Sequence, residues 1–284
     1  MTRRLVLLAV VLLAATATLN ADIMFDRGLP VSNLNNIAGA NRSNVAWGYW
    51  CDPTLGCNYS VGDTFNLNKP GTYDVTDIRT WMIGTDSEPL SSMWSNLTLY
   101  LGDVSGNIDH TSTVETSGDP HAAISAVTYA DGSSYQNSSG TFDTIYQVDF
   151  LLNWALDGQT TYTFFVGGTP AAENLTSYPY HPVGAYGPGV SPFLLSTNKA
   201  LSDNCGGCTQ EGADNQMYYL GYSGGSVTDF GTWDSSVGGW WDKSSDVNVE
   251  VFVPEPSAVT LLMVMFGAVG FIGFTLRRRL SASR

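Results

Sequence analysis

Apolar and polar side chains alternate with a period of two residues in the middle of the chain. The alternation is found in residues 72–83, 96–101, 144–152, 161–166 and 246–253. Successive side chains of a β-strand point to opposite faces, so this period predicts strands that bury one face. In the first segment it places Tyr73, Val75 and Trp81 on the same face. Residues 22–252 contain no sustained apolar stripe of the helical period, so we expect no long helix there.

Turn residues and composition favour the same fold class. Gly, Asn, Asp and Ser cluster between the alternating segments, as turns require. Tyr, Trp and Thr are plentiful, whereas Lys, Arg and Glu are scarce, which is typical of strands. We therefore expect an all-β ectodomain over residues 22–252, an antiparallel β-sandwich of jelly-roll type. Residues 167–231, rich in Pro, Gly and Asn, are expected to form long loops over this sandwich.

The charge of this region limits its partners. Residues 22–256 carry all 26 acidic side chains of the chain and six of its 12 basic ones, which gives a net charge of −20. Such a surface repels nucleic acid and anionic lipid, so neither is expected as a partner. The acidity is compatible with a soluble domain outside the cell.

The N-terminus has the pattern of a secretory signal peptide. Arg3 and Arg4 precede an apolar run over residues 5–15, and small and polar residues follow as far as Ala21. This apolar run is shorter than the roughly 20 residues that span a bilayer. We expect a signal peptidase to remove residues 1–21, with cleavage after Ala17 as the alternative. A buried N-terminal helix is the competing interpretation.

The C-terminus differs because its apolar run is long enough to cross a membrane. Residues 257–276 carry no charge and, as a helix, would extend about 30 Å. Arg277, Arg278 and Arg279 follow at once, and the positive-inside rule places them in the cytoplasm. With the signal peptide removed, the rest of the chain lies outside the cytoplasmic membrane, attached by one C-terminal span.

A proline-rich tripeptide, Pro254-Glu255-Pro256, directly precedes this span. Together with the apolar helix and the terminal arginines, it resembles the PEP-CTERM sorting signal of Gram-negative bacteria over residues 253–284. The resemblance implies processing by an exosortase, which would transfer the protein from the inner membrane to the cell surface or an exopolysaccharide matrix. The two prolines keep the backbone extended and available for recognition. A permanent membrane stalk and a GPI signal are the alternatives, although a GPI signal normally ends in its apolar tail.

A second resemblance concerns the ectodomain. Residues 62–166 are similar to the "choice-of-anchor" ectodomains that commonly precede such tails. The similar parts are 63–65, 97–103 and 156–162. This resemblance implies a β-sandwich fold and specifies no ligand.

The four cysteines form two local pairs, Cys51 with Cys57 and Cys205 with Cys208. An even number in an exported protein favours disulfides, and local bridging is the simplest of the three connectivities. A redox Cys-x-x-Cys lacks its usual βαβ context here, and the first spacing is too long for a zinc knuckle.

No catalytic constellation is recognised. Residues 221–225 match the G-x-S-x-G pattern, but no helix is expected after Ser223 and no histidine follows it, so we expect a glycine-rich turn. His110, His121 and His181 lie in separate Pro-, Asp- and Gly-rich stretches and are expected to be solvated loop residues. Glycosidases need two opposed carboxylates, and the sequence does not indicate which ones.

Two sets of residues are candidates for binding. Asp103, Ser105, Asn107 and Asp109 offer oxygen atoms at alternate positions, as a calcium loop does. Two EF-hand positions are missing, and an ordinary polar turn is the favoured interpretation. Trp233, Trp240 and Trp241 are candidates for stacking on sugar rings, with burial in the core as the alternative. Calcium is the only cofactor that the sequence suggests.

Three functional hypotheses follow. The first is a non-enzymatic surface or matrix protein that is displayed and associates with exopolysaccharide. The second is a carbohydrate-binding or adhesive module that uses the tryptophans. The third is a secreted polysaccharide hydrolase.

Overall fold

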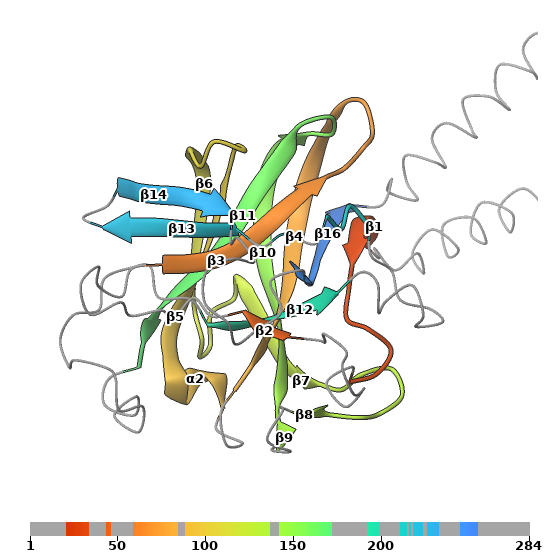
Figure 1. The fold of residues 1–284 in the computed structure, drawn as a ribbon, viewed down its shortest axis with the longest axis vertical. Coiled ribbons are helices and arrows are strands. Elements are labelled where there is room, and N and C mark those ends of the chain that lie inside the picture. Colours follow the sequence, from red (N-terminus) through yellow and green to blue (C-terminus); the bar gives the residue numbers. More distant parts are fainter. Residues whose placement is uncertain are drawn as a thin grey trace, which may run out of the picture. The chain divides into compact units, whose positions relative to one another are not determined.

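Antiparallel strands account for nearly all the regular structure of the residues that the structure describes (Figure 1). The computed structural model describes residues 21–33, 44–46, 59–84, 89–136, 142–171, 192–198, 211–214, 216, 218–223, 226–232 and 245–254. Among these residues the only helix is α2, a single turn at Leu90–Met93. The predicted all-β fold is therefore confirmed.

The strands form two large sheets and one small ribbon. The first sheet has the order β1 (Ala21–Arg27), β16 (Val249–Pro254), β4 (Thr72–Ile83), β10 (Ile145–Asp157) and β7 (Ala122–Val127). Beside its path lie β12 (Phe193–Asn198), β15 (Ser245–Val247) and β2 (Asn44–Ala46). The second sheet has the order β14 (Ser226–Thr232), β13 (Tyr218–Ser223), β3 (Tyr59–Asn66), β11 (Thr161–Pro170), β5 (Trp94–Gly102) and β6 (Ile108–Glu115). The ribbon pairs β8 (Tyr135–Gln136) with β9 (Phe142–Asp143).

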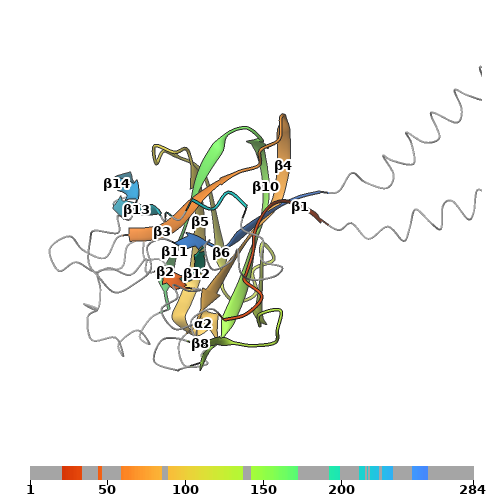
Figure 2. The same ribbon diagram turned by 45° about the vertical axis from the view of Figure 1, so that its right-hand side comes forward.

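The chain passes repeatedly between the two sheets, which lie as two layers in Figure 2. Strands β1, β4, β10 and β16 belong to the first sheet, and β3, β5, β6 and β11 to the second. Contacts join the inner faces, as shown by the rings of Phe25 on β1 and Phe65 on β3, whose centroids are 5.7 Å apart. The inner faces bury Ile78, Phe150 and Leu99 completely. The hydrophobic effect on these faces is the main force that stabilises the two layers.

A bulge interrupts the pairing of β10 with β4. Phe150 pairs with Ile78 and Trp154 pairs with Val75, so five residues of β10 (150–154) oppose four of β4 (75–78). The period of two along β10 is therefore broken between Leu151 and Trp154. Val75 and Trp81 are both buried, and the prediction that Tyr73, Val75 and Trp81 share one face stays a prediction.

Trp81 is buried within a second apolar cluster, which covers one end of the outer face of the first sheet. Its buried members are Trp81, Ile83, Tyr129, Tyr135, Ile145 and Leu195. Tyr129 and Tyr135 come from the segment between β7 and β9, which therefore packs over the sheet. On the outer face of the second sheet, Tyr100 packs with Phe165.

Three further strands occur where the sequence predicted long loops. Strands β12 and β13 lie within residues 167–231, and so does β14 except for its last residue, Thr232. The prediction of loops is wrong for these strands. Their sequences are short, and glycine interrupts β13 and β14. Their pairing depends on the edges that other strands offer: β12 pairs with β2, β4 and β15, and β13 pairs with β3 and β14.

Gly62 is required where β3 approaches β11. A Cβ at this position would overlap the backbone carbonyl of Phe164. We expect Gly62→Ala to lower the free energy of unfolding by about 3 kcal/mol, because two paired backbones would have to separate. Gly118→Ala is the matched control, because an added Cβ at Gly118 would meet open space. The only expected cost there is the strain of alanine at a φ of +78°, about 1 kcal/mol. Urea denaturation of both variants measures the difference, and equal costs would contradict the steric explanation.

Candidate functional site

A buried ion cluster joins the two sheets at the end of β1. Arg27, the last residue of β1, is completely buried, and so are Asp63 on β3 and Asp246 on β15. Arg27 Nη2 lies 3.5 Å from Asp63 Oδ2, and Nη1 lies 3.7 Å from Asp246 Oδ1. The guanidinium also donates to the carbonyl oxygens of Val247 (Nε, 3.0 Å) and Thr64 (Nη2, 2.8 Å). Arg27 therefore places one positive charge between two carboxylates and connects three strands.

The backbone supports the two carboxylates. Asp63 accepts hydrogen bonds from the N–H groups of Thr64 (2.6 Å) and Val247 (2.7 Å), and Asp246 accepts one from the N–H of Asp214 (2.7 Å). Burial raises the pKa of Asp63 well above its ordinary value, although the charge of Arg27 opposes this effect. The stability of this cluster therefore depends on the positive charge of Arg27.

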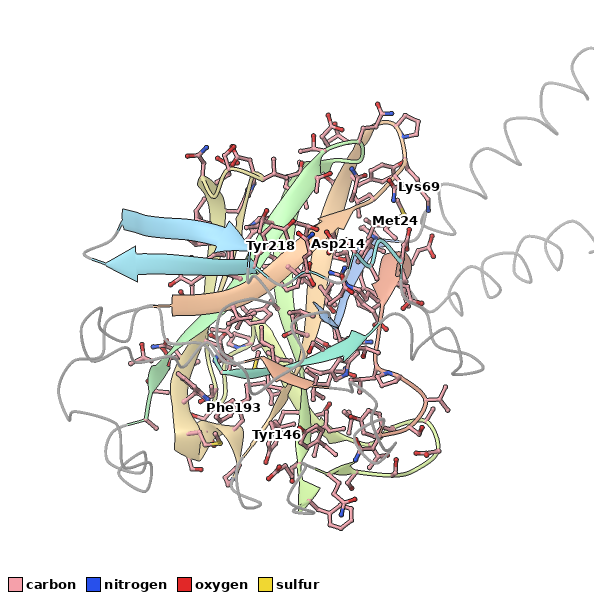
Figure 3. The ribbon with its side chains drawn as sticks, viewed as in Figure 1. Met24, Lys69, Tyr146, Phe193, Asp214 and Tyr218 are labelled. Carbon is pink, nitrogen blue, oxygen red and sulfur yellow. The ribbon has the colours of Figure 1, made fainter. Side chains whose placement is uncertain are left out.

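Asp63 and Asp246 also lie close to the carboxylate of Asp214, as the ligands of a metal ion would. One oxygen each of Asp63, Asp214 and Asp246 lie within 4.8 Å of one another, and Figure 3 labels Asp214 together with Tyr218. Both oxygens of Asp63 already accept backbone hydrogen bonds, and Arg27 supplies the cation that such a group of acids needs. We interpret the cluster as an ion-pair network that stabilises the fold rather than as a metal centre.

A second charged group forms a row across the outer face of the first sheet. Arg79 on β4 pairs in register with Asp149 on β10 and with Glu250 on β16. Its guanidinium binds both oxygens of Asp149, at 2.7 Å and 3.1 Å, and Glu250 Oε2 at 3.0 Å. It also lies over the ring of Phe252, 4.7 Å from the centroid. These contacts hold Arg79 in one geometry, since the two-point contact of a guanidinium with a carboxylate is directional.

Asp77 belongs to the same face, but its carboxylate is not hydrogen-bonded to Arg79 as those of Asp149 and Glu250 are. Its Oδ1 is buried without a hydrogen-bond partner among the described residues. Burial raises the pKa of Asp77 to about 7, with a further contribution from the charge of Asp149. Asp77 is therefore the carboxyl group here that is suited to hold a proton near neutral pH. It is the residue on which a test for hydrolase activity should concentrate.

A groove opens between the edges of the two sheets, where β7 ends. It has a volume of about 530 Å³ and is lined by Thr111, Ser112, Thr113, His121, Leu151, Leu152, Asn153 and Trp154. Strand β7 pairs with β10 only from Ile145 to Phe150, which leaves the next residues of β10 beside the groove. The N–H of Leu151 donates to the carbonyl of His121 (3.0 Å) and closes one end of this opening.

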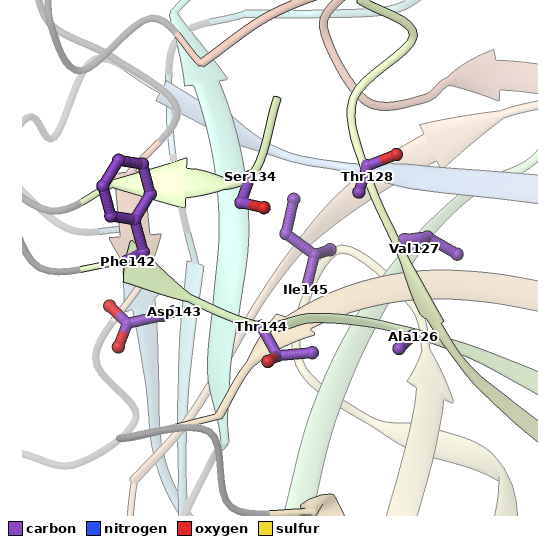
Figure 4. A pocket seen from close by; sticks show the side chains of 8 residues that line it. All are labelled: Ala126, Val127, Thr128, Ser134, Phe142, Asp143, Thr144 and Ile145. Atoms are coloured by element: carbon purple, nitrogen blue, oxygen red, sulfur yellow. The ribbon is translucent and has the colours of Figure 1, made fainter. Parts of the chain in front are cut away.

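A second hollow, of about 400 Å³, lies beside the β8–β9 ribbon (Figure 4). Figure 4 shows Phe142 and Asp143 across this hollow from Ala126 and Val127. The Phe142 side chain is 63% exposed, so this hollow offers an aromatic ring without a second ring to hold it.

The proposed calcium loop is a turn between β5 and β6. Asp103 Oδ1 accepts hydrogen bonds from the N–H groups of Ser105 (2.7 Å) and Asn107 (3.2 Å), and Oδ2 accepts one from the Asn107 amide (2.8 Å). These bonds lower the pKa of Asp103, the Asn107 amide most of all. The hydrogen bonds account for the Asp-x-Ser-x-Asn spacing as a polar turn, and calcium binding stays a prediction.

The other motifs fall partly within the described residues. Ser223 ends β13 and pairs with Ser226 of β14, so the G-x-S-x-G match lies in a β-hairpin and not at a strand–helix elbow. His121 is an exposed turn residue, as expected. His110 is not a loop residue: it lies on β6, and its ring is 5.1 Å from that of Trp154. The strand around His110 was not predicted, because its sequence is rich in Asp, Ser and Thr.

Most of the residues singled out in the sequence lie outside the described part of the chain. These are His181, Glu255, Pro256, Cys51, Cys57, Cys205, Cys208, Trp233, Trp240, Trp241, Arg277, Arg278 and Arg279. Pro254 is described and is the exposed last residue of β16. The described residues include no helix that is long and apolar enough to cross a membrane, and the predicted span at 257–276 lies outside them.

No protein-family model matches this chain, and no curated protein or solved structure shows a significant similarity to it.

Proposed function

We propose that this chain is an exported, non-enzymatic surface or matrix protein whose β-domain is displayed outside the cell by means of its C-terminal sorting tail. The observation that carries the proposal is the position of Pro254. This first residue of the Pro-Glu-Pro motif is also the exposed last residue of β16. The folded domain thus leads into the motif without a spacer. Because proline lacks an N–H, strand pairing stops where a processing enzyme would need an extended chain.

The order of the strands supports a jelly-roll domain as the displayed part. If β1, β3, β4, β5, β6, β10, β11 and β16 are counted from one to eight, the first sheet runs 1-8-3-6 and the second 2-7-4-5. This is the order of a double Greek key closed into two sheets. Residues 23–252 form one compact unit, which agrees with a domain that functions apart from its sorting signals.

The remaining parts of the proposal come from the sequence. Residues 1–21 act as the signal peptide, and residues 257–276 with Arg277–Arg279 hold the chain in the inner membrane until an exosortase-like enzyme removes the tail. The mature protein then associates with exopolysaccharide at the surface or in the matrix, with both cysteine pairs oxidised.

Replacing Pro254, Glu255 and Pro256 together with alanine tests the sorting step. We expect the full-length protein to accumulate in the inner membrane with its tail intact, because the extended recognition element is lost. Mass spectrometry of the C-terminus and protease shaving of intact cells measure processing and surface delivery. The Ser257→Ala variant, one residue beyond the motif, should be processed normally. An unchanged mature C-terminus in the triple variant would contradict the proposal.

A carbohydrate-binding module is the second candidate. The groove between β6 and β10 favours it, because the groove combines a partly exposed tryptophan with hydroxyl and amide groups.

A further inference from the structure

We propose that the groove between β6 and β10 binds a neutral glycan chain, with Trp154 as the stacking platform. This groove is defined by Thr111, Ser112, Thr113, His121, Leu151, Leu152, Asn153 and Trp154. The inference deepens the proposed function and rests on it, since the domain meets extracellular glycans only if it is exported.

The lining has the chemistry that a sugar requires. Threonine and serine hydroxyls both donate and accept hydrogen bonds, and so does the side-chain amide of Asn153, which matches the hydroxyl groups of a sugar ring. Leucine side chains and the indole of Trp154 offer apolar surface for the C–H face of the ring. A volume of about 530 Å³ lies within the range of small-ligand sites.

The charge of the lining selects a neutral ligand. The chain carries 26 acidic residues, yet none of the eight lining residues is acidic, and none is lysine or arginine. The lining has no carboxylate that could bind a metal ion. It also has no lysine or arginine that could bind a polyanionic chain, and the acidic domain repels such a chain. A neutral polymer meets neither obstacle.

The fold holds Trp154 in place. The register of β10 against β4 shifts between Leu151 and Trp154, and such a bulge redirects the side chains that follow it. The ring of His110 then packs against Trp154 with a 5.1 Å centroid distance and a tilt of 48°. His110 is a positioning residue in this arrangement, and its buried Nδ1 has no hydrogen-bond partner among the described residues. A platform fixed before binding loses little entropy when a ligand stacks on it.

The shape of the groove favours a chain over a single sugar. It is open to solvent, because β7 begins only at Ala122, opposite Phe150, and leaves the following residues of β10 uncovered on that side. An extended peptide strand could pair with the same edge of β10, but such pairing uses backbone groups and would not depend on the indole ring. Dependence on Trp154 therefore distinguishes the two occupants.

Calorimetric titration of the mature protein, purified from its producing cells, tests this proposal. The probes are cellohexaose, mannohexaose and xylohexaose, with a hexamer of galacturonic acid as the anionic counterpart. We expect at least one neutral hexamer to bind with a dissociation constant of about 1 mM or lower, and the anionic hexamer to bind more weakly. Failure of all three neutral hexamers to bind would overturn the proposal.

Substitutions locate the binding. Trp154→Ala should raise the dissociation constant about tenfold or more, Asn153→Ala should raise it severalfold, and Trp154→Phe should restore most of the affinity lost in Trp154→Ala. Phe142→Ala removes an exposed ring outside the groove and should have no effect. If Trp154→Ala fails to fold, Trp154→Phe and Asn153→Ala still decide the result. Unchanged affinity in these variants, or binding of a peptide strand alone, would overturn the proposal. The Pro254–Pro256 variant alters sorting but not this affinity, so failure of the glycan site and failure of the proposed function are distinguishable.

Discussion

Arg27→Met is expected to lower the free energy of unfolding at pH 7 by about 3–5 kcal/mol. The substitution keeps much of the apolar volume of the side chain but removes the cation that lies between Asp63 and Asp246, both of which are completely buried. Two carboxylates would then be left in the core with backbone hydrogen bonds alone. Chemical denaturation followed by circular dichroism measures the loss.

The pH dependence of this loss provides a second measurement. Burial already raises the pKa of Asp63, and Arg27 opposes that rise, so removal of Arg27 raises the pKa further. A raised pKa in the folded state means that protonation favours folding, and the destabilisation should therefore shrink as the pH falls. The triple variant Arg27→Met, Asp63→Asn, Asp246→Asn should recover part of the stability at pH 7. A loss below about 1 kcal/mol for Arg27→Met, constant with pH, would show that the cluster contributes little.

Asp77→Asn is expected to stabilise the protein above neutral pH. The pKa of Asp77 is about 7 in the folded protein against an ordinary value of 3.8, because burial and the charge of Asp149 disfavour its ionised form. Stability from this group is present below pH 4 and is lost as the pH rises through about 7. Because asparagine never ionises, the variant should exceed the original protein by roughly 2–4 kcal/mol at pH 8 and equal it near pH 3.

Unfolding curves between pH 3 and pH 8 test this expectation. Asp74→Asn is the matched control, since Asp74 is an exposed residue of the same strand. The charged groups near Asp77 are Arg79, Asp149 and Glu250, and all three remain in both variants. Parallel stability profiles for Asp77→Asn and the original protein would contradict the assignment.

Much of the secondary structure could be predicted from the sequence, because strand geometry is local. The alternation at 72–83 coincides with β4, and the segments at 96–101 and 161–166 lie within β5 and β11. The glycines around Ser223 predicted a turn, and the structure pairs Ser223 with Ser226 in two strands that were not predicted. Strands β12 to β14 were missed because their short sequences pair only where another strand offers an edge.

The candidate sites were less accessible to sequence reasoning. Arg27 and Val247 are 220 positions apart in the chain, and Arg79 and Asp149 are 70 positions apart. Abundant acidic residues gave no indication of which ones would meet. Trp154 lies two residues beyond the predicted strand segment 144–152, and its neighbour His110 was predicted to lie in a loop, so neither residue indicated a groove.

The sequence by itself determined the period of two, the acidity of residues 22–256 and the chemistry of the residues around Pro254. These properties depend on residue types and on spacing along the chain. Only the tertiary structure decided that a bulge interrupts β10 beside β4, that Arg27 lies between two buried carboxylates, and that Trp154 borders an open groove. The physical reason is that register, bulges and burial follow from the pairing of distant strands, and a local pattern does not contain that pairing.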